Sequence, residues 1–398
     1  MRQEPPIVSV IRRRATLLRE LRDVFDTRGF LEVQPPCLMP GCVADAFIDP
    51  IEIPWSSVRL PGPDATASPR LFLQTSPELA MKQMLAAGAP SIYSIGPVFR
   101  GGESGPQHRV EFTMLEWYEV GGDERSAIAL IGAIAGEILG RGTIEVRDYR
   151  RLFADHCGLD PLEADVAELR RLLAASDPGL AASVGDDRDG LLEILFAERV
   201  QPHLGHDRPL VVRNYPLTQA ALAKTADDDP DCAARFEWFV DGVELANGYD
   251  ELLDPDELVR RTARHNRRRE SAGRPALPLD QGLLAAMRRG LPPSAGVALG
   301  VDRLQMIRER RDDLGGCGFD ALPLTHAPNL TDAPSSPDAL SSPGAPSSPD
   351  APGSPDAPSS PGDPNSPDAL ISWGDLRPPG GLNPPGGITP AFGDRNRV

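Results

Sequence analysis

Lysine is nearly absent from this 398-residue sequence: Lys82 and Lys224 are the two lysines among 41 basic residues. Acidic residues are more numerous, and the formal net charge of −17 argues against broad electrostatic binding to nucleic acid. No run of about 18 apolar residues occurs, so no membrane span is predicted. The first 20 residues also lack the apolar core and small-residue cleavage site of a secretory signal.

Cysteine is scarce and scattered, with five residues in the chain. Cys37 and Cys42 are close in sequence, but no second pair or nearby histidine completes a zinc site. We therefore predict free thiols and a reducing, cytoplasmic location. Common catalytic patterns are missing too, because the chain has no Walker A loop, no GxGxxG, no HExxH and no nucleophile elbow. A bound nucleotide would have to be held by arginines and carboxylates on a sheet.

The C-terminal part of the chain differs in composition from the rest. Residues 335–370 form six proline-containing hexapeptides, and Ser, Pro, Asp, Gly and Ala dominate from about Pro323 onward. Such a segment cannot bury enough apolar surface to offset the entropy lost on ordering. We predict a catalytic domain over 1–322 and an extended, disordered tail over 323–398.

Residues 260–270, "RRTARHNRRRE", carry six arginines in an otherwise acidic chain. Two interpretations are open: a solvated helix face, or a docking surface for an acidic partner.

The folded part alternates helices with strand pairs and shows no repeated βαβ unit. Apolar spacing predicts an amphipathic helix around 17–25, and a strand followed by a helix in "PRLFLQTSPELAMKQMLAAG", with Ser76 as N-cap and Pro77 as first helical residue. Strands are predicted at 92–100, 110–119, 209–216, 235–240 and 243–252, and mostly helix over 124–200. The fold class is therefore α+β, with a large antiparallel sheet flanked by helices.

The predicted strand 110–119, "VEFTMLEWYE", contains a carboxylate that its neighbours do not explain. Phe112, Met114, Glu116 and Tyr118 alternate onto one face, and no lysine or arginine lies within the strand. A lone carboxylate on an apolar face is costly unless a cation or strong donors meet it. The sequence thus predicts that a cation or strong hydrogen-bond donors lie against Glu116.

A second acidic pair is predicted in "RFEWFVDGVELANGYDE". Asp241-Gly242 is typical of a two-residue hairpin turn, and this register pairs Phe239 with Glu244 and Glu237 with Ala246. Glu237 and Glu244 then share a face, where two like charges favour a bound cation such as Mg²⁺, unless the face is simply exposed.

Two arginines stand beside glycine-rich segments. Arg100 precedes the loop "GGESGPQHR", which also holds Glu103 and His108, and this arrangement suits phosphate recognition or a solvated hairpin. Arg303 follows "AGVALG", where Gly296 and Gly300 indicate close approach of a ligand or tight packing.

Together these segments resemble the class II aminoacyl-tRNA synthetases. "FDTRGFLEVQPP", "VFRGGESGPQHRVEFTMLEWYE" and "GVALGVDRL" resemble motifs 1, 2 and 3 in the right order. "TSPELAMK" and "FEWFVDGVELANGYDEL" are similar to segments of the lysyl subgroup. The closest similarity, over about 7–310, is to the short lysyl-tRNA synthetase paralogues that ligate (R)-β-lysine to a lysine of elongation factor P.

The resemblance implies roles for matching positions. Arg100 and Arg303 would be catalytic and bind the α- and γ-phosphates of ATP, with Phe112 and Arg303 enclosing adenine. The remaining ATP-binding positions would be Glu103, His108, Glu244, Leu245 and Gly300. Glu237 and Glu244 would hold Mg²⁺. The substrate, lysine or (R)-β-lysine, would be bound by Ser76, Glu78, Glu116, Tyr118, Asn247 and Glu251.

The resemblance also implies a homodimer that forms an aminoacyl-adenylate and transfers it to elongation factor P. Motif 1 begins within the first thirty residues, so we expect no anticodon-binding domain and no tRNA acceptor. The family pattern H-N-P-E-F is altered here to "HRVEF", with Arg109 and Val110 in the ATP loop. Three alternatives stay open: a synthetase-like enzyme with another acceptor, a non-catalytic amino-acid sensor, and a scaffold whose tail binds partners.

Overall fold

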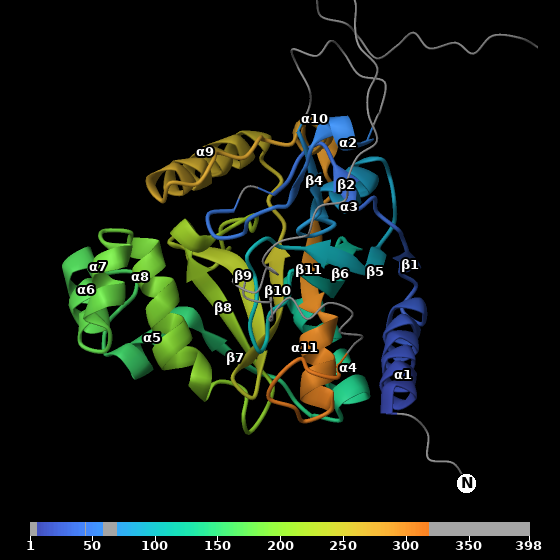
Figure 1. Ribbon diagram of the computed structural model, residues 1–398, viewed down its shortest axis with the longest axis horizontal. Coiled ribbons are helices and arrows are strands. Elements are labelled where there is room, and N and C mark those ends of the chain that lie inside the picture. Colours follow the sequence, from blue (N-terminus) through green and yellow to red (C-terminus); the bar gives the residue numbers. More distant parts are fainter. Residues whose placement is uncertain (1–5, 44, 59–69, 318–398) are drawn as a thin grey trace, which may run out of the picture. The chain divides into compact units, whose positions relative to one another are not determined.

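The computed structural model describes residues 6–43, 45–58 and 70–317 (Figure 1). The predicted tail over 323–398 lies outside these residues. No helix in the described part of the chain is long and apolar enough to cross a membrane.

Eight strands form one sheet in the order β1-β5-β6-β11-β10-β9-β8-β7. Their bounds are β1 (Leu31–Glu32), β5 (Ile92–Phe99), β6 (Glu111–Val120), β7 (Glu145–Asp148), β8 (Leu210–Pro216), β9 (Cys232–Val240), β10 (Val243–Asp250) and β11 (Ser294–Gly300). The six central strands pair antiparallel, whereas the edge strands β1 and β7 pair parallel with β5 and β8. The predicted α+β class is confirmed, but the sheet is mixed at its edges, because β1 and β7 each reach their neighbour through a crossover.

One face of the sheet is covered by α1 (Pro6–Asp26) and α4 (Glu124–Leu139) (Figure 1). The periodic residues Leu17, Leu21 and Phe25 of α1 are fully buried, with the Phe25 ring centroid 5.2 Å from that of Trp117 on β6. Leu115 and Trp117 therefore face this core. Strand alternation directs Glu116 and Tyr118 to the opposite face, as the sequence predicts.

A group of short helices packs beside β8, at the β7 edge of the sheet (Figure 1). It comprises α5 (Tyr149–Cys157), α6 (Val166–Ala174), α7 (Pro178–Val184), α8 (Arg188–Leu195), a π-helical turn at Phe196–Val200 and a 3₁₀ turn at Gln201–His203. The prediction of mostly helix over 124–200 is confirmed except for β7. This four-residue strand has an exposed, charged pattern that carries little signal of pairing.

The other face of the sheet carries further elements. These are α3 (Glu78–Ala86), α9 (Pro255–Ser271), α10 (Gln281–Gly290), a 3₁₀ turn (Leu217–Gln219), and a small sheet of β2 (Leu38–Met39), β4 (Leu71–Leu73) and β3 (Glu52–Ile53). The short α2 (Trp55–Val58) follows β3. After β11, the chain turns directly into α11 (Val301–Arg308).

The hairpin of β9 and β10 is confirmed at its turn and corrected beyond it. Asp241 and Gly242 have φ values of 51° and 75°, as a two-residue turn requires, and Phe239 pairs with Glu244. A β-bulge then shifts the register, so Glu237 pairs with Asn247 instead of the predicted Ala246. One extra residue in a strand reverses which side chains face each side. The bulge therefore brings Asn247 onto the face of Glu237.

The basic run 260–270 lies on α9, and three of its six arginines are buried or half-buried. Arg261 and Arg269 are 4% and 2% exposed, and the Arg268 guanidinium lies over the Phe47 ring and pairs with Asp187 at 2.8 Å. Both interpretations from the sequence are therefore wrong for these three, whose guanidinium groups join α9 to neighbouring segments. Arg260, Arg264 and Arg267 are exposed.

Candidate active site

A cavity of about 450 Å³ opens on the face of the sheet opposite α1 and α4. All fifteen residues singled out from the sequence line it: Ser76, Glu78, Arg100, Glu103, His108, Phe112, Glu116, Tyr118, Glu237, Glu244, Leu245, Asn247, Glu251, Gly300 and Arg303. They come from β6, β9, β10, β11, the start of α3, the start of α11 and the loop before β6. The cavity therefore collects segments up to 227 residues apart in the chain.

Three buried carboxylates and one buried lysine form the acidic end of the cavity. Lys82 of α3 lies 2.5 Å from a carboxylate oxygen of Glu78 and 2.5 Å from one of Glu251. Glu116 accepts hydrogen bonds from the Ser76 hydroxyl at 2.6 Å and the Tyr118 hydroxyl at 2.7 Å. With these carboxylates ionised and the lysine charged, the group carries a net charge of −2. It is suited to bind a cationic ligand.

Burial shifts the ionisation of this group. Desolvation raises the pKa of Glu116 to about 7, with the charge of Glu78 adding to the effect. Desolvation likewise raises the pKa of Glu251 to about 8, although Lys82 opposes it, and the two neighbouring carboxylates raise it further. The pKa of Lys82 is raised because the attraction of Glu251 and Glu78 exceeds the cost of burial. The acidic end therefore takes up protons near neutral pH.

Gly296 of β11 makes room for this arrangement. A Cβ at this position would lie 2.2 Å from a Glu251 carboxylate oxygen and 2.5 Å from the Tyr118 ring. The close approach predicted for this strand glycine is confirmed, and what approaches is the Glu251 and Tyr118 side chains.

Ser76 has two partners at the entry to α3. Its hydroxyl accepts a hydrogen bond from the Glu78 amide at 3.1 Å and donates to Glu116. The helix begins at Glu78, one residue later than predicted, with Pro77 at the N-cap position. The hydroxyl therefore connects the helix start to the strand that carries Glu116.

Arg100 and Phe112 lie together where the loop before β6 lines the cavity. The Arg100 guanidinium carbon lies 5.1 Å from the Phe112 ring centroid, and its Nε donates to the Thr75 carbonyl at 3.3 Å. A carboxylate oxygen of Glu103 lies 3.7 Å from Nη1 of Arg100. In the structure, the Arg100 guanidinium lies over the Phe112 ring. The resemblance implies a different pairing when ATP is bound, with adenine between Phe112 and Arg303, and this stays a prediction.

Arg303, in the first turn of α11, contacts both β10 and the loop before β6. It donates to the Glu244 carbonyl at 3.0 Å and the Gln107 carbonyl at 3.2 Å. Its Nη2 lies 2.6 Å from Nε2 of His108, whose pKa is lowered by burial and by the arginine charge. A neutral histidine can accept this hydrogen bond.

The Glu237 carboxylate is bound by a positively charged side chain and by a hydroxyl group. Arg235 and the Tyr215 hydroxyl each lie 2.5 Å from one of its oxygens. Burial raises the pKa of Glu237 despite the attraction of Arg235. Glu244 on the same face is more exposed, and its carboxylate is 3.6 Å from Arg303. Within the ranges that the structure describes, no group of three or more His, Cys, Asp or Glu side chains forms a complete metal site.

Comparison with known proteins identifies the family. The model of the class II tRNA synthetases (D, K and N) matches residues 2–313. The chain belongs to this family. The protein of Yersinia enterocolitica named elongation factor P--(R)-beta-lysine ligase is 41% identical over 302 residues, covering 76% of this chain and 91% of that protein. Proteins of the same name from Yersinia pestis and Yersinia pseudotuberculosis are 40% identical over the same shares.

The predicted synthetase fold is thereby confirmed, and the chain is an ATP-dependent amino acid ligase of the class II type. Arg100, Phe112 and Glu116 lie in the segment that resembles motif 2, and Arg303 in that of motif 3. The roles assigned to individual side chains stay predictions.

Lys82, Arg235 and Tyr215 were missed by sequence reasoning. For Lys82 a signal was present: one of two lysines stands four residues after Glu78, in a helix that is otherwise largely apolar. Arg235 is two residues before Glu237, so strand alternation puts both on one face. Tyr215 lies on another strand, and its contact with Glu237 depends on sheet pairing.

The five cysteines are free thiols, as predicted. Cys42 and Cys232 are buried, and desolvation raises the pKa of each thiol to about 12. These thiols are therefore uncharged at neutral pH and suited neither to nucleophilic attack nor to metal binding.

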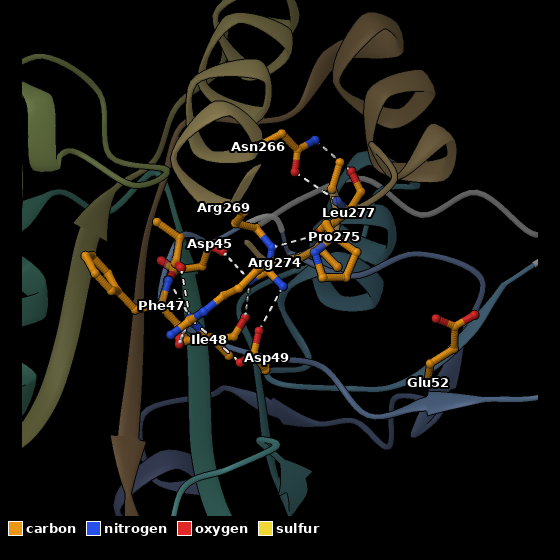
Figure 2. A network of polar contacts seen from close by, with 12 residues as sticks. Asp45, Phe47, Ile48, Asp49, Glu52, Asn266, Arg269, Arg274, Pro275 and Leu277 are labelled. Carbon is orange, nitrogen blue, oxygen red and sulfur yellow. Dashed lines mark hydrogen bonds and ion pairs between the residues drawn. The ribbon is translucent and has the colours of Figure 1, made fainter. Parts of the chain in front are cut away.

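A buried arginine of α9, Arg269, binds the segment around residues 45–49 (Figure 2). Arg269 donates to the carbonyls of Asp45, Ile48 and Pro275, each at 3.0 Å, and to the Asp49 carboxylate at 2.8 Å. The Asp49 carbonyl in turn accepts from the amide of Gly101 at 2.7 Å. The backbone next to Arg100 is thus fixed through two layers of hydrogen bonds.

Proposed function

We propose that this class II ligase activates lysine or (R)-β-lysine with ATP and transfers the aminoacyl group to a lysine side chain of elongation factor P. The observation that carries the proposal is the acidic end of the cavity, where Glu78, Glu116 and Glu251 surround one lysine. The names of the Yersinia relatives agree with a lysine-type substrate and with this acceptor.

The two ends of the cavity suit the two substrates. The ammonium groups of a diamino acid fit the acidic end, which has a deficit of cations. ATP fits the end that presents Arg100, Arg303 and the Phe112 ring, since guanidinium groups bind phosphate oxygens strongly. This arrangement directs the substrate carboxylate toward the α-phosphate.

In the first step, a carboxylate oxygen of the amino acid attacks the α-phosphorus, and pyrophosphate leaves. Negative charge grows on the α-phosphoryl oxygens, where Arg100 is positioned to stabilise it. Arg303 holds the γ-phosphate and keeps the leaving group in line. Asn247, brought to this face by the bulge, and Gly300 border the reacting carboxylate.

Glu244 and Glu237 are the residues that would hold Mg²⁺. One or two carboxylates together with substrate phosphates are a common environment for this ion. Glu244 is accessible from the cavity, and Glu237 keeps unused lone pairs beside Arg235 and Tyr215. When bound, the ion would neutralise part of the phosphate charge.

In the second step, the amine of an acceptor lysine attacks the carbonyl carbon of the aminoacyl-adenylate, and AMP leaves. An isopeptide bond forms, and the amine loses a proton. No side chain of the enzyme forms a covalent bond in this scheme. The net charge of −17 supports a protein acceptor over tRNA.

We further propose a cytoplasmic homodimer formed around motif 1. Ile11 of α1 and Leu31 of the edge strand β1 are each 55% exposed, and Ile7 is 42% exposed. Exposed apolar side chains on a helix next to an unpaired strand edge are suited to a second copy of the same surface.

The test is ATP–pyrophosphate exchange with α-lysine, (R)-β-lysine and a panel of other amino acids, on protein shown to be folded. We expect exchange with at least one of the two lysines and a mass increase of elongation factor P by one lysyl residue. Folded protein without exchange on either lysine would refute the proposed substrate. Exchange without modification of elongation factor P would refute the acceptor.

A further inference from the structure

The chain after α11 returns to the ATP loop and binds it. We define the strap as Glu309–Cys317, and the ATP loop as Arg100–Val110. Leu314 and Cys317 of the strap are buried in the main core, at 3% and 0% exposure. The strap is thus anchored at two points in the interior.

One strap residue makes two hydrogen bonds to the loop. The Leu314 amide donates to the Pro106 carbonyl at 2.8 Å, and the Leu314 carbonyl accepts from Nη2 of Arg109 at 2.7 Å. These two contacts flank Gln107 and His108, whose backbone and side chain meet Arg303. Arg303 and Leu314 lie eleven residues apart on the same segment, so the loop is attached twice to one structural unit.

The loop itself has few internal constraints. Gly105 and His108 form an isolated bridge with amide–carbonyl distances of 3.1 Å and 3.3 Å. Gly102, Ser104, Gly105 and Pro106 are exposed. A glycine-rich loop of this kind depends on external contacts for its position.

We propose that Arg109 is a positioning residue that fastens the ATP loop to the strap and so holds Arg303 and His108 in the arrangement that receives ATP. This inference rests on the proposed use of ATP. It explains why an arginine occupies a position where the family pattern has asparagine: the guanidinium spans from the loop to the Leu314 carbonyl. Arg109 and Leu314 both line the cavity.

The principal test changes Arg109 to Ala and measures two quantities. The first is hydrogen–deuterium exchange of the loop and strap without ligands, where the Leu314 and Gly105 amides are expected to exchange at least tenfold faster. The second is the KM for ATP in pyrophosphate exchange, expected to rise about tenfold, while the KM for lysine changes less than twofold. A hydrogen bond from a charged donor has the strength needed for such a change.

Two further variants control for charge and folding. Arg109→Lys keeps a donor that can reach the carbonyl and should recover part of the effect on both quantities. Arg308→Ala removes an arginine of α11 that pairs with Glu20 of α1, and should leave the loop amides and the KM for ATP unchanged. Melting temperatures within about 2 °C of the wild type would show that each variant is folded.

The outcomes separate the proposal from its alternatives. A higher KM for ATP with unchanged loop exchange would mean that Arg109 touches a phosphate directly, and would overturn a positioning role. Faster loop exchange with an unchanged KM would overturn the link to ATP. If the wild type shows no pyrophosphate exchange, the proposed function fails on its own, and the loop amides still decide whether Arg109 holds the loop.

Discussion

Replacing Glu116 by Gln tests the acidic end most directly. The change keeps the shape of the side chain and removes its charge. The carboxylate is buried and bound by the hydroxyls of Ser76 and Tyr118, and the group has a pKa of about 7. In the ligand-free protein, the glutamate is therefore mainly ionised at pH 8 and mainly protonated at pH 6.

The expected loss of affinity follows from the charge. A hydrogen bond between two charged groups contributes about 1.5–3 kcal/mol, so at pH 8 the KM for the amino acid should rise roughly 10- to 150-fold. The KM for ATP should change less than threefold, because the hydrogen-bond partners of Glu116 are Ser76 and Tyr118 and not the arginines proposed to bind phosphate. At pH 6, the wild type must lose a proton before it binds the ammonium, so the difference between the proteins should shrink by about tenfold.

Glu116→Gln should weaken binding of the amino acid but stabilise the folded protein. The folded-state pKa of Glu116 is raised from 4.5 to about 7, so its protonated form stabilises the fold below pH 4.5, and this contribution is lost as pH rises to 7. At pH 8 the ionised carboxylate costs roughly 3 kcal/mol relative to a neutral side chain. Glu116→Gln should therefore melt at a higher temperature than the wild type at pH 8, and the two should converge near pH 4.5.

The assay is pyrophosphate exchange and thermal unfolding at pH 6, 7 and 8. Glu119→Gln is the matched control, because Glu119 lies on the same strand but does not line the cavity. If the KM for lysine changed less than threefold at pH 8, or the KM for ATP rose equally, the assignment of Glu116 to the substrate ammonium would be wrong.

Three other substitutions have clear expectations. Arg303→Ala should reduce pyrophosphate exchange by about 10³-fold, and retention of activity would remove the motif 3 assignment. Gly296→Ala places a methyl group against Glu251 and should reduce lysine activation at least tenfold with little change in ATP binding; equal effects on both substrates would contradict this. Lys82→Met leaves Glu78 and Glu251 without their cation and should destabilise the fold by roughly 3–5 kcal/mol at pH 8. The loss should be smaller at pH 5.5, where the carboxylates take up protons, and a pH-independent loss in thermal unfolding would show that packing dominates.

Much of the fold could be predicted because its signals are local. The apolar spacing of α1, the alternation in β6 and the Asp241-Gly242 turn depend on neighbouring residues alone, and each is confirmed. The short strand β4 (Leu71–Leu73) was also predicted, but the parallel edges of the sheet and the two-residue strands β2 and β3 were not. Strands of two to four residues carry almost no periodic signal, and their pairing is determined by distant parts of the chain.

The site was predicted residue by residue, but its internal partners were not. All fifteen residues to which the sequence analysis assigned a role line the cavity. Strand alternation predicted the shared face of Glu116 and Tyr118, whereas most of the other positions were implied by the resemblance to the synthetase family. The partner of Glu251, by contrast, is Lys82 on a helix 169 residues earlier in the chain. The β-bulge between Glu244 and Ala246 also left no trace in the sequence, since no glycine marks it.

The charge of the acidic end accounts for the kind of amino acid that fits it. Glu78, Glu116 and Glu251 bring three negative charges and Lys82 one positive charge, which leaves a deficit of two. Protons fill part of this deficit in the empty enzyme, as the raised pKa values of Glu116 and Glu251 indicate. Lysine and (R)-β-lysine each carry two ammonium groups and match the deficit, whereas a monoamino acid leaves one buried charge uncompensated. We therefore expect Lys82 to contribute to selectivity, because its pairing with Glu78 and Glu251 sets how many further cations the site needs.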